Sequence, residues 1–217
     1  MVSCVIMTGG VIDKFIGDAV MAHWGAVESS GSAEADAFCA VRTALMMRAS
    51  LYCFNKSRGG VKNPVIKIGC GLSSGTVVAG QIGSDERVIF TVIGDVVSFA
   101  ARTETFNKPF GTEILITEHT WKLVKEHIIA QEMGTVTDRG REVKIFTVIN
   151  IKDGPEADLL LKDLKKIPKT DSSICRMCVG PGGPHSLDEL RKLLGIPTPD
   201  LSNLNLGKAE KKYSVAS

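Results

Sequence analysis

Hydrophobic and polar positions alternate with two different periods along the first third of the chain. Val11–Ile16 and Ala19–Trp24 are short, mostly apolar runs separated only by Gly17-Asp18, a spacing typical of two strands joined by a tight hairpin turn. From Ser32 to Lys56, small and apolar residues recur every three or four positions. This second period predicts an amphipathic helix after the hairpin.

The rest of the pattern adds further strands and helices of ordinary length. Val65–Leu72 alternates as a half-buried strand does, and Thr76–Ile82 is expected to pair back on it. The other predicted elements are a helix end at residues 1–8, a strand at Val88–Ile93, a helix from Gly94-Asp95 to Asn107, a strand at Ile114–Ile116, a helix at Glu118–Glu126, and strands at Ile129–Val136 and Val143–Ile149. Together they predict an α+β fold in which helices pack on a mostly antiparallel sheet.

A change in composition after Asn150 predicts where the domain ends. Turn signals, Lys/Asp-rich stretches and Gly/Pro-rich stretches follow it. Within this part, Ser186–Leu194 has a capping-box pattern, with Ser186 as N-cap and Glu189 three residues later. We therefore expect one domain over residues 1–150 and a C-terminal tail with one short helix over residues 151–217.

Composition and charge narrow the function classes. The chain has 217 residues, of which 44% are hydrophobic and 23% charged, with a formal net charge of +2. Such a small charge predicts no nonspecific binding to nucleic acid or to an acidic membrane. The sequence contains no run of about 18 apolar residues, so we expect no membrane-spanning segment in it. Four of the six cysteines lie in apolar or amphipathic runs, which indicates reduced thiols and a cytoplasmic location.

Three ordered blocks carry the candidate chemistry. They are GGVIDKFIGDAVMAHWG (Gly9–Gly25), GCGLSSGTVVAGQIG (Gly69–Gly83) and FTVIGDVVSFAARTE (Phe90–Glu104). In this order they resemble the class III adenylate and guanylate cyclases over about residues 1–150. The resemblance implies a ferredoxin-like cyclase fold and a homodimer with two shared active sites. It also implies conversion of ATP to cyclic AMP and pyrophosphate.

Two positions in these blocks match the residues with which the family reads the purine. Lys14 supplies only hydrogen-bond donors, which suits the acceptor at N1 of adenine. The hydroxyl of Thr91 can accept from the 6-amino group, whereas guanine reverses both groups. Guanylate cyclases carry glutamate where Lys14 stands, so the pair favours ATP. Without the resemblance, Lys14 is interpreted as a solvated strand lysine and Thr91 as an ordinary strand residue.

The hairpin turn offers a candidate metal ligand. Asp18 matches one of the family's two metal aspartates, and the resemblance implies two divalent cations, Mg²⁺ or Mn²⁺, bound by carboxylate oxygens. Taken alone, Gly17-Asp18 is simply a favourable turn pair. The surrounding block supports the metal interpretation.

Three further residues are matched to the ribose and the phosphates. Arg102 matches the arginine that stabilises transition-state charge, and Ser98, one helical turn earlier, stands where most members have an asparagine that orients the ribose. Arg139 aligns with the family's basic residue that binds the terminal phosphates of the nucleotide. As alternatives, Arg102 could form an ion pair with a nearby glutamate, and Arg139 could belong to a solvated hairpin turn.

Two departures from the family pattern lead to an alternative function. Members carry a strand with the first metal aspartate, and then a helix, about 40 residues ahead of the Gly9-Gly10 hairpin. This sequence begins about eight residues before the hairpin, so we expect its catalytic domain to lack that strand, that helix and one of the two metal carboxylates. From this we expect a fragment with little activity on its own, from a parent protein that could be membrane-anchored through its N-terminal side. Together with Ser98, this leaves open a regulatory module that binds nucleotide or a cyclase partner without turnover. One C-x-x-C pair, Cys175 and Cys178, with His185 nearby, is a weak zinc or redox signal.

Overall fold

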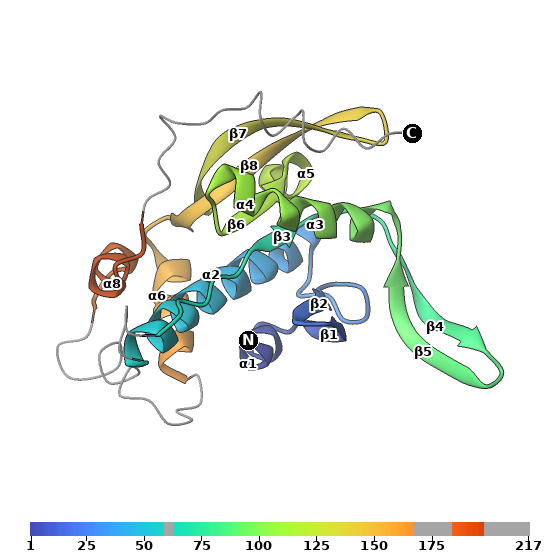
Figure 1. The fold of residues 1–217 in the computed structure, drawn as a ribbon, viewed down its shortest axis with the longest axis horizontal. Coiled ribbons are helices and arrows are strands. Elements are labelled where there is room, and N and C mark those ends of the chain that lie inside the picture. The colour runs from blue at the N-terminus through green and yellow to red at the C-terminus, as the bar shows by residue number, and fades with distance from the viewer. Residues whose placement is uncertain (59–62, 167–183, 198–217) are drawn as a thin grey trace.

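The computed structural model describes residues 1–58, 63–166 and 184–197, and Figure 1 shows how their helices and strands are arranged. The helices are α1 (Val2–Met7), α2 (Ala33–Ser57), α3 (Asp95–Thr105), α4 (Asn107–Phe110), α5 (Glu118–Val124), α6 (Pro155–Lys166) and α8 (Leu187–Leu194). The strands are β1 (Val11–Ile16), β2 (Ala19–His23), β3 (Cys70–Leu72), β4 (Val78–Ser84), β5 (Arg87–Ile93), β6 (Ile114–Thr117), β7 (Ile128–Asp138) and β8 (Arg141–Ile151).

The central sheet has four strands in the order β3-β6-β8-β7. The β3–β6 pair is parallel, while β6–β8 and β7–β8 are antiparallel. Two separate hairpins, β1–β2 and β4–β5, form further antiparallel pairs. The predicted α+β fold with a mostly antiparallel sheet is confirmed.

Helices cover both faces of this sheet, and the alternation of side chains along each strand produces two cores. Ile116 of β6 and Phe146 of β8 pack with α2 and α5 in one core. The residues that precede them on the two strands, Leu115 and Ile145, pack in the other core with Phe99 of α3. Because neighbouring side chains on a strand point to opposite faces, one sheet supports both cores.

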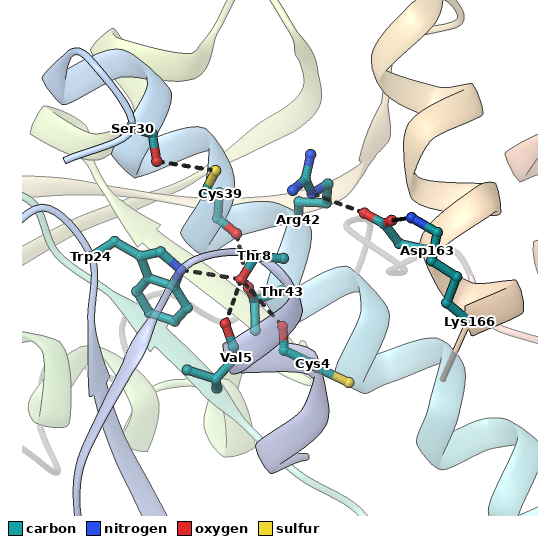
Figure 2. A network of polar contacts seen from close by, with 10 residues as sticks. All are labelled: Cys4, Val5, Thr8, Trp24, Ser30, Cys39, Arg42, Thr43, Asp163 and Lys166. Carbon is teal, nitrogen blue, oxygen red and sulfur yellow. Dashed lines mark hydrogen bonds and ion pairs between the residues drawn. The ribbon is translucent and has the colours of Figure 1, made fainter. Parts of the chain in front are cut away.

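The β1–β2 hairpin is attached to α2 through a buried hydroxyl. Thr8, at the end of α1, lies 2.5 Å from the Thr43 hydroxyl of α2, and the indole of Trp24 donates to Thr8 over 3.2 Å (Figure 2). The indole also lies against Gly10, where an added Cβ would meet it at 2.5 Å. Any side chain at position 10 would therefore displace Trp24 from the contact that orients the hairpin.

Helix α3 sits directly on strand β3. A Cβ at Gly71 would meet the backbone of α3 at 2.2 Å, which leaves room there for glycine only. Asn107, just after α3, donates through its side chain to the Cys70 carbonyl over 3.0 Å. These contacts hold α3 at a definite height above the sheet.

Two predicted strands of the middle segment were wrong in extent or partner. Strand β3 spans only Cys70–Leu72, because Ile66 is bonded through both its N–H and its C=O to the Asn55 side chain on α2 rather than to a strand. Strand β4 pairs with β5, not with residues 65–72. A two-residue connection brings Ser84 opposite Arg87, and this local pairing replaces the one expected.

Among the described residues after 150, the structure has one more helix than predicted. Helix α8 was predicted, and its N-cap Ser186 accepts a hydrogen bond from the Glu189 N–H over 3.2 Å as expected. Helix α6 was not predicted, and it packs beside α2 (Figure 1). Leucines of both helices join the core next to α2: Leu160, Leu161, Leu164, Leu187, Leu190 and Leu194. Helix α6 was missed because its Lys/Asp-rich composition is typical of a solvated tail. The boundary between domain and tail stays a prediction.

Buried charged groups attach these C-terminal helices to the domain. Arg42 of α2 lies 3.8 Å from Asp163 of α6 (Figure 2). Arg191 of α8 and Arg48 of α2 both donate to the backbone carbonyl of Ile149, at the end of β8. Two guanidinium groups on one carbonyl fix the position of α8 relative to the sheet.

Helix α2 is long and apolar enough, by length and composition alone, to cross a membrane. However, 56% of its most apolar stretch is buried inside the structure, and Arg42 and Arg48 on the same helix are buried as well. This burial is typical of the core helix of a globular domain, and we interpret α2 in that way.

We predict that α6 contributes to the stability of the domain. Leu160 is 2% exposed, so Leu160→Ala should lower the free energy of unfolding, measured by urea denaturation, by about 2–5 kcal/mol. The matched control is its neighbour Leu159, which is 38% exposed and should cost less than about 1 kcal/mol as alanine. Equal losses for the two variants would contradict the packing described here.

Candidate functional site

The two predicted base-reading residues meet where β1 approaches β5. The Lys14 ammonium donates to the Thr91 hydroxyl over 2.9 Å, although the residues are 77 positions apart in the sequence. Thr91 is buried, and the Lys14 side chain is 37% exposed, so the pair opens to solvent on the lysine side. The structure thus brings together the pair that the motifs predicted.

A third residue, Asp13, completes this cluster and was not predicted from the sequence. Its side chain is fully buried and accepts from the Thr91 hydroxyl at 2.7 and 3.0 Å and from the Val92 N–H at 3.1 Å. It also lies 3.0 Å from the Lys14 ammonium. An aspartate beside a lysine, in a strand whose other residues are apolar, was the signal in the sequence, because such a group is buried only with partners.

An irregularity in β1 explains how neighbouring residues reach the same partner. Successive side chains of a regular strand point to opposite faces, yet Asp13 and Lys14 both contact Thr91. The register of β1 against β2 shifts between Ile12 and Lys14. Such bulges redirect side chains, and this one turns both charged groups toward β5.

The electrostatics of the cluster favour an ionised carboxylate. Burial alone would raise the pKa of Asp13, but hydrogen bonds from Thr91, Lys14 and the Val92 N–H together hold it below its usual value. Nearby, burial lowers the pKa of His23, although the charge of Asp13 opposes this. The imidazole Nε2 of His23 is buried without a hydrogen-bond partner among the described residues.

Asp18 lies at the tip of the β1–β2 hairpin and is exposed. Gly17 before it has φ +62°, a conformation that favours glycine and allows the tight turn. The charge of Asp18 is felt on α3: the pKa of Glu104 is raised first by desolvation and then by the negative charge of Asp18. Glu104 is a second acidic residue of this region that the motifs did not single out as a ligand.

The metal-binding role of Asp18 stays a prediction. Among the described residues, no group of three or more His, Cys, Asp or Glu side chains could hold a metal ion. Mg²⁺ is commonly bound by one or two carboxylates together with substrate phosphates. The exposed carboxylate of Asp18 can serve as such a ligand.

Ser98 and Arg102 lie one turn apart on α3, as predicted. Ser98 is exposed, and Arg102 is partly exposed with its guanidinium 5.7 Å from the centre of the Phe99 ring. A cation over an aromatic face gains modest energy. Ser98 and Arg102 thus lie on one face of α3, and both are at least partly accessible to solvent.

Arg139 lies at the tip of the β7–β8 hairpin, in a left-handed conformation with φ +47°. Its guanidinium forms an ion pair with Asp95, the first residue of α3. Both side chains are more than half exposed, so the pair is weak and can exchange for a phosphate. The contact brings Arg139 to the helix that carries Ser98 and Arg102, and its phosphate-binding role stays a prediction.

The structure places only some of the predicted cysteine and histidine candidates. Cys175 and Cys178 lie outside the described residues. His185 precedes α8 and donates through its backbone N–H to Glu189 over 2.7 Å. Cys4, Cys39 and Cys70 are free thiols, in agreement with the interpretation of reduced cysteines.

Comparison with known proteins identifies the family of this fold and site. Residues 12–150 match the family model described as adenylate and guanylate cyclase catalytic domain. An adenylate cyclase of Anabaena cylindrica is 42% identical over 114 residues, which cover 51% of the chain and 21% of that relative. The chain thus spans about a fifth of the length of this relative.

Solved structures of an adenylyl cyclase and of a guanylyl cyclase are similar to the fold of this chain. The adenylyl cyclase CyaB of P. aeruginosa superimposes with a TM-score of 0.62 at 29% identity, covering 71% of this chain and 78% of that one. The guanylyl cyclase Cya2 gives a TM-score of 0.60 at 27% identity, covering 71% and 77%. With the family model matching well over half of its length, the chain belongs to the family of adenylate and guanylate cyclase catalytic domains.

Proposed function

We propose that the chain is the catalytic part of an adenylate cyclase, which converts ATP to 3′,5′-cyclic AMP and pyrophosphate. The hydrogen bond between Lys14 and Thr91 is the observation that carries this proposal. An ammonium can donate to N1 of adenine, and a hydroxyl oxygen can accept from the 6-amino group. Guanine presents a donor at N1 and an acceptor at O6, which oppose both contacts.

The overall fold does not choose between ATP and GTP, because it is similar to cyclases of both kinds. The choice therefore depends on individual side chains in the base-reading positions. The relative from Anabaena cylindrica, named an adenylate cyclase, supports the choice of ATP.

The remaining site residues suit the chemistry of cyclisation. The ribose 3′-hydroxyl passes its proton to solvent water, its oxygen bonds to the α-phosphorus, and the bond from that phosphorus to the bridging oxygen breaks to release pyrophosphate. Arg102 would stabilise the negative charge that develops on the phosphate, and Ser98 would donate a hydrogen bond to the ribose. Arg139 would leave Asp95 to bind the terminal phosphates. Two divalent cations, Mg²⁺ or Mn²⁺, would neutralise the leaving group, and Asp18 would be a ligand.

We further propose that two copies of the chain share the active sites. Each site would take Asp18 from one protomer and Lys14, Thr91, Ser98 and Arg102 from its partner. The β4–β5 hairpin supports this assembly, because it projects as a long arm (Figure 1) with exposed apolar side chains, including Val78 at 69% and Val88 at 55%. An isolated two-stranded hairpin is marginally stable in water, so contact with a second copy would stabilise it.

Reversing the charge of Lys14 tests the base-reading assignment. Lys14→Glu should weaken ATP binding by about 10- to 100-fold, because a charge-assisted hydrogen bond is replaced by repulsion at N1. Isothermal titration with ATP and mass spectrometry of cyclic AMP would measure binding and turnover. Lys108→Glu, an exposed lysine of α4, is the control. Unchanged ATP binding and turnover in Lys14→Glu would contradict the assignment.

Removing the Asp18 carboxylate tests the metal assignment. Asp18→Asn should lower the affinity for ATP by about tenfold in the presence of Mn²⁺ and leave it unchanged in EDTA, because only a metal-bridged contact is lost. Asp153→Asn, an exposed aspartate of the turn before α6, is the matched control. An equal effect of Asp18→Asn with and without the metal would argue against a ligand role.

Mixing these two variants tests the shared sites. In a two-fold dimer that pairs Lys14→Glu with Asp18→Asn, one site would keep both intact residues and the other would lose both. Random mixing in equal amounts should then restore about a quarter of the wild-type cyclic AMP formation, although each variant alone is nearly inactive. No recovery in a mixture that sedimentation shows to be dimeric would mean that each site lies within one protomer.

A further inference from the structure

The hydrogen-bonding capacity of the Thr91 hydroxyl is almost fully used within the protein. A hydroxyl has one proton to donate and two lone pairs to accept with. Its proton is directed to the Asp13 carboxylate at 2.7 and 3.0 Å, and one lone pair receives the Lys14 ammonium at 2.9 Å. A single acceptor site is left for a ligand.

The Lys14 ammonium is used in the same way. It has three N–H groups and no acceptor. One N–H is directed to Asp13 at 3.0 Å and one to Thr91 at 2.9 Å. One donor remains, beside the one acceptor of Thr91.

We propose that Asp13 is a positioning residue that sets base specificity. It fixes the orientation of the Thr91 hydroxyl so that the hydroxyl oxygen, and not the hydroxyl proton, is available to the purine. We call this fixed orientation the lock. This inference rests on the proposed adenylate cyclase function and adds a residue to it. The donor and the acceptor left over match N1 and the 6-amino group of adenine. Guanine would place its N1–H against the ammonium and its O6 against an oxygen that can only accept.

The burial of Asp13 explains why the lock is strong. For Thr91 to donate to O6 of guanine, its proton would have to leave a fully buried carboxylate. An unpaired buried charge is costly, and an ionised carboxylate can only accept, so it cannot reverse the direction of the bond. The Val92 N–H at 3.1 Å holds Asp13 in place and prevents it from turning away.

The Asp13→Asn variant tests the lock in the full 217-residue chain. An asparagine of nearly the same shape can donate through its amide to Thr91, which frees the threonine proton. The ratio of ATP to GTP affinity, measured by titration of each nucleotide, should fall by about tenfold because GTP binding improves relative to ATP. Asp36→Asn is the control, since Asp36 accepts hydrogen bonds from Ser29 and Ser30 outside the site and its loss should leave the ratio unchanged.

A double variant separates positioning from a general loss of structure. Thr91→Val removes the hydroxyl, so adding Asp13→Asn to it should change the ratio no further. A purely structural role of Asp13 would weaken ATP and GTP equally, in either background. Equal weakening, or an unchanged ratio in the folded Asp13→Asn variant, would overturn the proposal.

A measurement on the unaltered chain keeps the test decisive even if the variant does not fold. Inosine triphosphate has the N1–H and O6 of guanine but lacks its 2-amino group, so the lock predicts that it binds as poorly as GTP. Binding as tight as that of ATP would overturn the lock.

The catalytic proposal fails by a different result. A chain that prefers ATP to GTP but fails to form, with Mn²⁺, even the low level of cyclic AMP expected of the fragment would contradict the proposed turnover and leave the lock standing. A chain that forms cyclic AMP while Asp13→Asn keeps the full preference for ATP would contradict the lock alone. The two failures are therefore distinguishable.

Discussion

The buried carboxylate of Asp13 is the interaction on which the site depends. It joins the β1–β2 hairpin to β5 through the Thr91 hydroxyl and the Val92 N–H, and it neutralises the Lys14 ammonium. A buried charge is tolerated only where partners compensate it, and here three hydrogen-bond donors come from two hairpins that are distant in sequence. The same bonds that stabilise the contact therefore also orient the groups available to a purine.

Much of the site could be predicted because it lies in local sequence blocks with a definite geometry. The Gly17-Asp18 turn, the helix after Gly94 and the four-residue spacing of Ser98 and Arg102 all follow from short-range rules. The two strands that flank the turn were likewise evident from their apolar runs. The meeting of Lys14 and Thr91 came from the family resemblance, since no periodicity links residues 77 positions apart.

The parts that could not be predicted depend on tertiary contacts. Asp13 appeared as one more polar residue of a strand, because only the bulge turns it toward β5. Residues 65–69 alternate like a strand, yet the Asn55 side chain takes the backbone bonds of Ile66. Helix α6 has a polar composition, and only its burial against α2 reveals its apolar face. In each case a partner far away in the sequence decides the structure.

A structure of the chain bound to 3′-deoxy-ATP, which lacks the attacking hydroxyl, and Mn²⁺ tests the central claim most directly. Our account predicts adenine N1 within hydrogen-bonding distance of the Lys14 ammonium and the 6-amino group beside the Thr91 hydroxyl, with Thr91 still donating to Asp13. A purine bound away from β1 and β5, or a Thr91 hydroxyl turned from Asp13 toward the base, would contradict it.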